Sequence, residues 1–296
     1  MEPSLVVSGS QDNTIKVWKN SKKLFVFEGV GNLRTILEVF KFLSSKEIVG
    51  VSRVSRRFYE ASFHFEVRKP IFREIMTLEG HNAPIYSVAV SEWKGILISA
   101  GGYDYKIIVW SLSTGQVTQV LKGHTKEVLC MTISGKADLV VSAGDYDFRI
   151  RVWNLNSRKP TLILRGHVGP IRSVAISSKD DLVVSGGWDR TIRVWSLTTR
   201  EQIRVLRGHT GDVNSVAICR SDFYIVSASN DSSVRVWSIA SRDQIKVLQG
   251  HGGFVCSVVI SSDDAFIVWE TKTKQLEYGV SFLVKLFKYS EGILDI

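Results

Sequence analysis

Cysteine and proline are scarce in this chain, with three cysteines and five prolines among 296 residues. Cys130, Cys219 and Cys256 form no C-x-x-C pair, so we expect neither a disulfide framework nor a cysteine zinc site, but small buried side chains in a reducing compartment. Few prolines, together with 44% hydrophobic and 23% charged residues, argue against wholesale disorder and allow a sizeable core.

Long apolar runs are also missing. Nowhere are there 18 consecutive apolar residues, and the first residues, MEPSLVVSGS, do not have the basic start and long apolar run of a signal peptide. We therefore expect a cytoplasmic and/or nuclear protein with no membrane partner. The formal net charge of +9 permits acidic partners, but much of the Lys and Arg recurs at one strand position, so nucleic-acid binding is the weakest expectation.

Motifs of enzyme chemistry are absent from the sequence. It has no phosphate loop, no H-E-x-x-H and no pair of carboxylates at a distinctive spacing, and His64 is the only histidine outside the repeated pattern described next. The sequence therefore predicts no enzyme activity, no catalytic residue, no cofactor and no metal site.

A repeat with a period of 42 or 43 residues dominates the chain. A Gly-His pair occurs five times, and a Trp follows each of the first four pairs at a nearly fixed distance, with an Asp six residues before that Trp. The five pairs end at His81, His124, His167, His209 and His251. A period of this length indicates stacked copies of one supersecondary unit.

One period, residues 166–207, shows what the unit is. Four short runs rich in Val and Ile, at 171–176, 182–185, 191–195 and 202–206, are bounded by Gly, Ser or Asp. Alternating runs with such punctuation predict a four-stranded antiparallel meander. So small a sheet cannot bury both of its faces, so it needs copies of itself on either side.

The Gly-His start, the late Trp and the period resemble the WD-repeat family. The resemblance covers about residues 72–270 plus a fragment at the start, and implies an all-β fold, a β-propeller with one four-stranded blade per repeat. One departure is visible, because the residue after the Trp is never the Asp of the family's name. The residues found there are Ser111, Asn154, Ser196 and Ser238.

The first and last repeats are incomplete in complementary ways. Residues 5–18 resemble the second half of a repeat, and 23–28 are a candidate outer strand for it. Residues 254–260 supply a first strand at the other end of the chain. There His251 stands only 18 residues before Trp269, whereas 28 or 29 residues separate His and Trp in the full repeats. We expect the C-terminal strand to pair with the N-terminal fragment, which closes a five-bladed ring and removes two sheet edges. The alternative is six blades in sequence, two of them incomplete.

Between the N-terminal fragment and the first full repeat, the period changes to that of a helix. Apolar residues from Leu33 to Leu43 fall on one helical face, and Ser44 with Glu47 three residues on makes a capping box for a second helix that fades after Ala61. The expected divisions are a partial repeat at 1–29 with three strands, a helical segment at 30–70, a propeller at 71–270 and an extension at 271–296.

Residues 33–62 resemble an F-box, the helical motif that docks substrate receptors on the adaptor of cullin-type ubiquitin ligases. The carrying features are Phe42-Leu43 at the end of the first helix, the Ser-Ser-Lys turn and the run 54–59, although the usual opening Leu-Pro is Asn32-Leu33 here. The resemblance implies these adaptor contacts: Leu37, Phe40, Leu43, Ile48, Val51 and Phe58. The alternative is an amphipathic helix pair packed on the propeller.

Each full repeat also contains a Ser, His and Asp, the inventory of a nucleophilic triad. Because the set recurs in four repeats, always with the Trp, we interpret it as the buried hydrogen-bonded tetrad that the WD-repeat resemblance implies. The sets are His81, Ser99, Asp104, Trp110; His124, Ser142, Asp147, Trp153; His167, Ser185, Asp189, Trp195; and His209, Ser227, Asp231, Trp237. Ring closure would add His251, Ser8, Asp12 and Trp18. The first two sets have an extra residue between Ser and Asp, which makes the Ser bond less certain there.

The resemblance places ligand contacts on the top face, three and five residues after each repeat His and one before each tetrad Asp. We name the predicted partner-binding residues the rim: Tyr86, Tyr103, Tyr146, Arg172, Trp188, Asn214, Asn230 and Phe254. Large aromatics and arginine are enriched in interface hot spots.

Two function classes remain open from the sequence. The first is a substrate receptor of a cullin ubiquitin ligase, with residues 33–62 on the adaptor and a substrate peptide or protein on the top face. The second is a WD-repeat scaffold of another multiprotein assembly with no ubiquitin role. Both make the chain a module for binding proteins.

Overall fold

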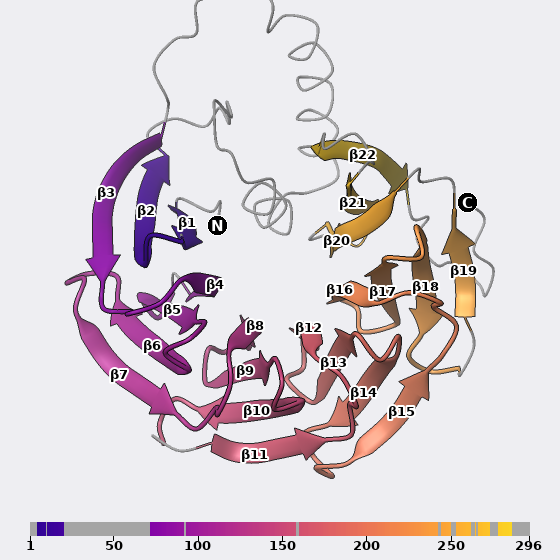
Figure 1. Ribbon diagram of the computed structural model, residues 1–296, viewed down its shortest axis with the longest axis horizontal. Coiled ribbons are helices and arrows are strands. Elements are labelled where there is room, and N and C mark those ends of the chain that lie inside the picture. The colour runs from indigo at the N-terminus through magenta and orange to yellow at the C-terminus, as the bar shows by residue number, and fades with distance from the viewer. Residues whose placement is uncertain are drawn as a thin grey trace, which may run out of the picture.

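In the computed structural model, residues 5–9, 11–20, 72–91, 93–157, 160–241, 244–249, 253–261, 264, 266–272 and 278–285 are described. Among them there are strands and turns and no helix. The strands form six antiparallel sheets, which we call blades 1 to 6 in chain order. Figure 1 shows the blades following one another around an arc, with blade 1 and blade 6 at its two ends.

Four of the blades have four strands each, ordered as they occur in the chain. Blade 2 consists of β4 (Ile85–Ser91), β5 (Ile96–Gly101), β6 (Lys106–Ser111) and β7 (Val117–Lys122). Blade 3 consists of β8 (Val128–Ile133), β9 (Leu139–Gly144), β10 (Arg149–Asn154) and β11 (Pro160–Arg165). Blade 4 consists of β12 (Ile171–Ile176), β13 (Leu182–Gly187), β14 (Ile192–Ser196) and β15 (Gln202–Leu206). Blade 5 consists of β16 (Val213–Ile218), β17 (Tyr224–Ser229), β18 (Val234–Ser238) and β19 (Gln244–Leu248).

The two end blades have three strands each. Blade 1 consists of β1 (Leu5–Gly9), β2 (Thr14–Asn20) and β3 (Phe72–Glu79), and blade 6 consists of β20 (Phe254–Ile260), β21 (Phe266–Lys272) and β22 (Tyr278–Lys285). The six successive blades agree with the propeller-like architecture that the repeats predict.

Burial along the strands follows from this arrangement. Every residue of β14 is buried, because the third strand of a blade has a neighbouring blade on each face, whereas β15 begins with exposed residues at the perimeter. Val and Ile suit such two-sided burial, which explains their abundance in the middle strands.

The hydrophobic core is divided into clusters that lie between neighbouring blades. One cluster joins Val184, Ile192 and Leu206 of blade 4 to Val213 and Trp237 of blade 5, and four similar clusters join the other neighbours. An aromatic side chain of this size buries roughly 150–250 Å². No blade has its core to itself, so each blade depends on the next for stability.

Serines of the innermost strands also join the blades. The Ser87 hydroxyl accepts a hydrogen bond from the backbone N–H of Met131 in the next blade at 3.2 Å. Ser173 does the same for Val216 at 3.1 Å, and Ser215 for Val258 at 3.2 Å. These bonds fix the position of one inner strand against the next along the arc.

Blade 1 is completed from a distant part of the chain. The outer edge of β2 pairs with β3, with Ile15 opposite Leu78 and Val17 opposite Met76. That edge is therefore held by residues 72–79 and not by residues 23–28, the candidate outer strand from the sequence. The long segment 21–71, which contains the F-box-like residues, thus enters and leaves the fold between two paired strands of one blade.

The predicted five-bladed closure is wrong, because β20 does not pair with the N-terminal fragment. It pairs with β21, with Phe254 opposite Lys272, and β21 pairs in turn with β22, while β1 pairs with β2. The alternative of six blades in sequence is what the structure has. Pairing with the segment that follows directly in the chain closes a short loop, which costs less conformational entropy than pairing with a strand about 240 residues away. Residues 278–285, expected in a C-terminal extension, are the third strand of blade 6.

The helical prediction for residues 30–70 lies outside the described residues. So do the six side chains predicted to contact an adaptor, namely Leu37, Phe40, Leu43, Ile48, Val51 and Phe58.

Candidate functional site

The tetrad side chains come together in each four-stranded blade. In blade 4, the His167 ring follows β11, Ser185 lies on β13, Asp189 in the β13–β14 turn and Trp195 on β14. His167 Nδ1 is 2.8 Å from Asp189 Oδ2, His167 Nε2 is 2.7 Å from Ser185 Oγ, and the Trp195 indole N–H donates to the same oxygen at 2.9 Å. In blade 5 the corresponding distances of His209, Asp231, Ser227 and Trp237 are 2.7, 2.7 and 2.8 Å.

The extra residue in blades 2 and 3 does not weaken the serine bond. His81 Nε2 is 2.7 Å from Ser99 Oγ and His124 Nε2 is 2.8 Å from Ser142 Oγ, as close as in blades 4 and 5. Their Nδ1 atoms are 2.6 and 2.9 Å from Asp104 and Asp147, and Trp110 and Trp153 each donate to the serine at 2.8 Å.

Two glycines make room for that extra residue. A Cβ added to Gly101 would lie 2.0 Å from Asp104 Oδ1 and 2.5 Å from His81 Nδ1, and one added to Gly144 would lie 2.2 Å from Asp147 Oδ1. Real side chains cannot approach so closely, so only glycine fits beside the carboxylate at these positions. This role of the glycine was not predicted from the sequence, although the glycine directly follows Ser-Ala in both repeats with the longer spacing.

One arrangement of protons satisfies all three contacts in a tetrad. Trp donates to Ser, Ser donates to His Nε2, and the Nδ1–H of a neutral His donates to Asp. Burial lowers the pKa of His124 and of His209, although the neighbouring Asp147 and Asp231 act in the opposite direction. Burial by itself would raise the pKa of Asp189, but its hydrogen bond to His167 and the charge interaction with that ring bring the pKa well below its ordinary value. In blades 3 and 5, where the pKa values of Asp147 and Asp231 are also lowered, the network is therefore a neutral histidine on a charged carboxylate.

The same aspartates also fix the turns of the top face, the end of the blades that carries the tetrad His and Asp. Asp189 Oδ1 accepts the backbone N–H of Thr191 at 3.1 Å, and Asp12 accepts that of Thr14 at 3.0 Å in blade 1. A side chain that bonds two residues on in this way makes an Asx-turn. Asp12 thus has the turn of a tetrad Asp, while His251 and the side chains of Ser8 and Trp18, its expected partners, lie outside the described residues.

An arginine and a glutamine extend the tetrad in blades 4 and 5. Arg193 Nη2 is 3.6 Å from Asp189, and its Nη1 donates to Gln202 Oε1 at 2.6 Å. Arg235 bridges Asp231 and Gln244 in the same way, at 3.8 and 2.5 Å. The two arginines occupy the strand position at which Lys and Arg recur, but the role of the glutamines was not predicted. Their signal in the sequence is a Gln seven residues after the Trp in just these two repeats.

The tetrads have the geometry of a structural network. Each serine hydroxyl is fully buried and is already engaged by both Trp and His. A nucleophile needs access to a substrate, which these oxygens lack. The tetrads hold the top-face turns in place instead of doing chemistry.

The rim residues lie on or beside these turns, and several of them are exposed. Tyr103 is 64% exposed, Tyr146 61%, Trp188 40% and Phe254 54%. Three of the four rings are in turns that follow the second strand of a blade, directly before a tetrad Asp. The structure thus places exposed aromatic rings on turns that hydrogen bonds fix.

The polar rim residues make contacts within the rim. The Arg172 guanidinium lies over the Trp188 ring, 4.6 Å from its centre. Asn214 donates to Asn230 Oδ1 at 2.7 Å and to the backbone oxygen of Val255 in blade 6 at 2.9 Å. Tyr86 is partly buried, and its contacts are described below.

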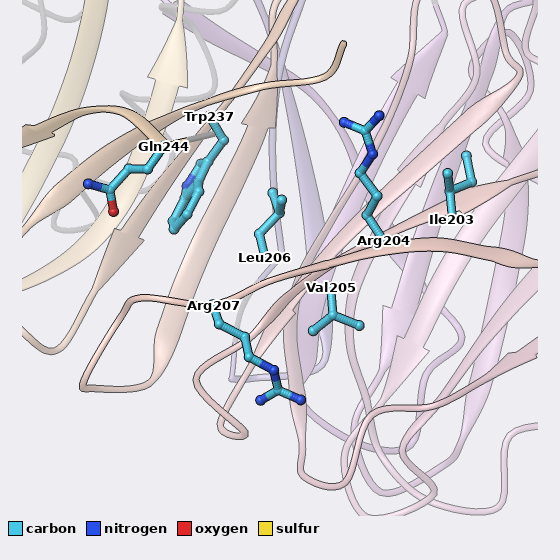
Figure 2. A pocket seen from close by; sticks show the side chains of 7 residues that line it. All are labelled: Ile203, Arg204, Val205, Leu206, Arg207, Trp237 and Gln244. Carbon is cyan, nitrogen blue, oxygen red and sulfur yellow. The ribbon is translucent and has the colours of Figure 1, made fainter. Parts of the chain in front are cut away.

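A groove at the perimeter lies away from the rim. Figure 2 shows its lining, the whole outer strand β15 except its first residue, with Arg207, Trp237 and Gln244. Arg204 in this groove donates through Nη2 to the backbone oxygen of Ala240 at 3.0 Å, which ties the outer strand of blade 4 to blade 5. These contacts join two blades, so the groove has a structural explanation.

Comparison with known proteins agrees with this geometry. The family model described as WD domain, G-beta repeat matches residues 2–19, 72–111, 115–154, 158–196, 200–238 and 242–268, more than half of the chain. No F-box model matches residues 33–62. No significant match was found among curated proteins. Among the described residues, no helix is long and apolar enough to cross a membrane.

Proteins built of these repeats are typically interaction scaffolds without enzyme activity, and the repeats indicate a module for protein–protein interaction. With six matched repeats, and with six successive blades and four tetrads among its described residues, this chain belongs to the WD domain, G-beta repeat family.

Proposed function

We propose that this chain is an interaction scaffold that binds a partner protein through its rim. The supporting observation is that Tyr103, Tyr146, Trp188 and Phe254 expose large aromatic rings on one face, on blades that are held together by shared cores. Rigid aromatic side chains contribute much contact area at a low entropy cost, which is why they dominate interface hot spots. In line with the sequence, we place this scaffold in the cytoplasm and/or nucleus.

The test compares partner proteins captured from cell extract by the full chain and by variants. Tyr146→Ala and Trp188→Ala are expected to lose the same captured proteins, because truncation of a hot-spot aromatic weakens binding by roughly tenfold or more. Phe223→Ala is the matched control, since Phe223 is 67% exposed but lies in the β16–β17 turn at the opposite end of the blade. Equal loss in the control, or no loss in either rim variant, would refute the proposal.

A finer proposal concerns residues 33–62. We propose that this segment is F-box-like and binds the adaptor of a cullin-type ubiquitin ligase, so that the chain is a substrate receptor of that ligase. Its support is the sequence pattern that ends in Phe42-Leu43 and the run 54–59, together with an insertion between β2 and β3 that leaves both strands paired. The competing proposal is a scaffold of another assembly in which the segment has no ubiquitin role.

Binding of the full chain to the purified adaptor separates the two. Leu43→Asp and Phe58→Asp each place a charge on the predicted apolar docking face and are expected to abolish binding. Glu38→Gln is the control, because Glu38 falls on the opposite face of the predicted first helix. If the unaltered chain does not bind the adaptor, the ubiquitin role is wrong and the scaffold proposal stands.

A further inference from the structure

Three of the rim tyrosines lie beside two carboxylates on the top face. This group lies where blades 2 and 3 meet and consists of Tyr86 on β4, Tyr103 in the β5–β6 turn, Glu127 just before β8, and Asp145 and Tyr146 in the β9–β10 turn. We call these five residues the acidic subsite. It rests on the proposed function, because it specifies what the rim binds.

Backbone hydrogen bonds hold the subsite in shape. The N–H of Gly102 donates to the oxygen of Pro84 at 2.8 Å, which ties the turn bearing Tyr103 to the loop before Tyr86. The N–H of Asp145 donates to the oxygen of Glu127, also at 2.8 Å, which ties together the two acidic segments of blade 3. A preformed site binds at a lower entropy cost than one that must order itself.

Tyr86 marks the inner wall of the subsite. Its ring lies against Gly102, where an added Cβ would be 2.7 Å from Tyr86 Cε2. The pKa of Tyr86 is raised, first by burial, then by the neighbouring and hydrogen-bonded Tyr103, and further by the charges of Glu127 and Asp145. The Tyr86 phenol therefore stays protonated and neutral, and both carboxylates lie near it.

The carboxylates are incompletely paired. Glu127 Oε2 is buried and has no hydrogen-bond partner among the described residues. The pKa of Asp145 is raised, first by burial and also by Glu127 and Asp147, while Arg172 acts in the opposite direction. Arg172 lies over Trp188 and balances one of the two subsite carboxylates at most. A buried acceptor without a donor is costly, so a donor from a partner would be stabilised there.

We propose that the acidic subsite receives a lysine or arginine side chain from a basic segment of the partner protein. The cation would donate to Glu127 Oε2 and lie beside the exposed rings of Tyr103 and Tyr146, since aromatic faces attract cations and charge-assisted hydrogen bonds are the strong ones. An acidic or phosphorylated segment would meet Glu127 and Asp145 with like charge. The net charge of +9 on the chain disfavours a basic partner. Binding of such a partner therefore depends on the local negative charge of Glu127 and Asp145.

The test measures binding of two labelled peptides to the full chain by fluorescence anisotropy. One is a repeat of Arg-Gly-Ser and the other is the same repeat with Glu in place of Arg. The basic peptide is expected to bind, and Glu127→Gln, which keeps the shape but removes the charge, is expected to weaken it by about tenfold or more. Glu201→Gln is the control, because it removes the same charge from an exposed turn at the opposite end of blade 4.

The peptide-binding test separates failure of the acidic subsite from failure of the rim. If the basic peptide does not bind, or if Glu127→Gln and Glu201→Gln weaken it equally, the inference about the subsite is wrong. If the acidic peptide binds instead and Arg172→Ala abolishes that binding, the inference fails while the rim remains the binding surface. If neither peptide binds and capture of partners is unaffected by the rim variants, the proposed function fails as well.

Discussion

Trp269 on β21 lies opposite Val258 on β20, at the register position where β17 of the neighbouring blade places Ser227 opposite Val216. Blade 6 therefore carries a tryptophan where a full blade carries the tetrad serine. Trp269 is 2% exposed and packs in the core between blades 5 and 6, with Val226, Val236 and Val255. Its burial in this core anchors the last blade.

Replacement of this side chain is expected to destabilise the protein strongly. Trp269→Ala should lower the free energy of unfolding of the blade 5–blade 6 unit by about 3–5 kcal/mol, the usual range for a buried aromatic truncated to alanine. Urea unfolding followed by circular dichroism measures it, with the exposed Trp188→Ala as a control for the loss of a tryptophan. A change below 1 kcal/mol at Trp269 would contradict the packing described here.

Gly101 is expected to tolerate no side chain, because a Cβ would collide with the carboxylate of Asp104. Gly101→Ala should cost about 1–3 kcal/mol of stability through strain and disruption of the His81–Asp104 contact. Gly135→Ala is the matched change, since an added Cβ there has nothing within 4 Å. Equal melting temperatures for the two variants would show that the Gly101 turn relaxes freely.

Loss of a tetrad serine leaves two buried groups without a partner. In Ser185→Ala, the Trp195 indole N–H and His167 Nε2 both lose their hydrogen bond, which should cost about 1–3 kcal/mol. Ser178→Ala, in an exposed turn of the same blade, removes a hydroxyl that donates to Asp222 near the surface and should cost less. Thermal unfolding of both variants and of the unaltered chain measures the two costs. An equal loss of melting temperature in Ser185→Ala and Ser178→Ala would contradict the prediction.

Stability should fall as the pH is lowered below about 6.5, the ordinary pKa of histidine. Burial lowers the pKa of His124 and His209 in the folded protein, so the unfolded chain binds more protons between the folded and unfolded pKa values, and acid favours unfolding there. Each of the two contributes up to about 1.4 kcal/mol per pH unit in that window. Below about pH 4, protonation of Asp147, Asp189 and Asp231, whose pKa values are lowered, should remove further stability. Urea midpoints that stay constant from pH 7.5 to 5 would contradict the lowered pKa values of His124 and His209.

Part of this structure could be predicted from the sequence, because copied residues occupy copied positions. The fixed distances from His167 to Trp195 and from Asp189 to Trp195 sufficed to predict which side chains would meet in a blade. The need for Gly101 could not be read from spacing, since it arises from the path of a turn around a carboxylate.

Strand pairing at the ends of the arc was harder to predict. Residues 72–79 were placed in the propeller at 71–270 and residues 23–28 were the candidate outer strand of the partial repeat, but β3 pairs with β2 across residues 21–71. Period alone does not reveal which sheet edge is free. At the other end, Asp264 has the left-handed backbone (φ 57°) of Asp222 in the same turn of blade 5, and that likeness marks β21 as a second strand. The prediction of a five-bladed closure could not use this likeness, because a backbone angle is not visible in a sequence.

The most direct measurement of the central claim is amide hydrogen exchange of the full chain, alone and with a captured partner protein. If the rim is the binding surface, protection should appear in the top-face turns at residues 102–105, 145–148 and 187–190. Protection confined to the outer strands or to the turns at the opposite end, such as residues 219–223, would contradict the account.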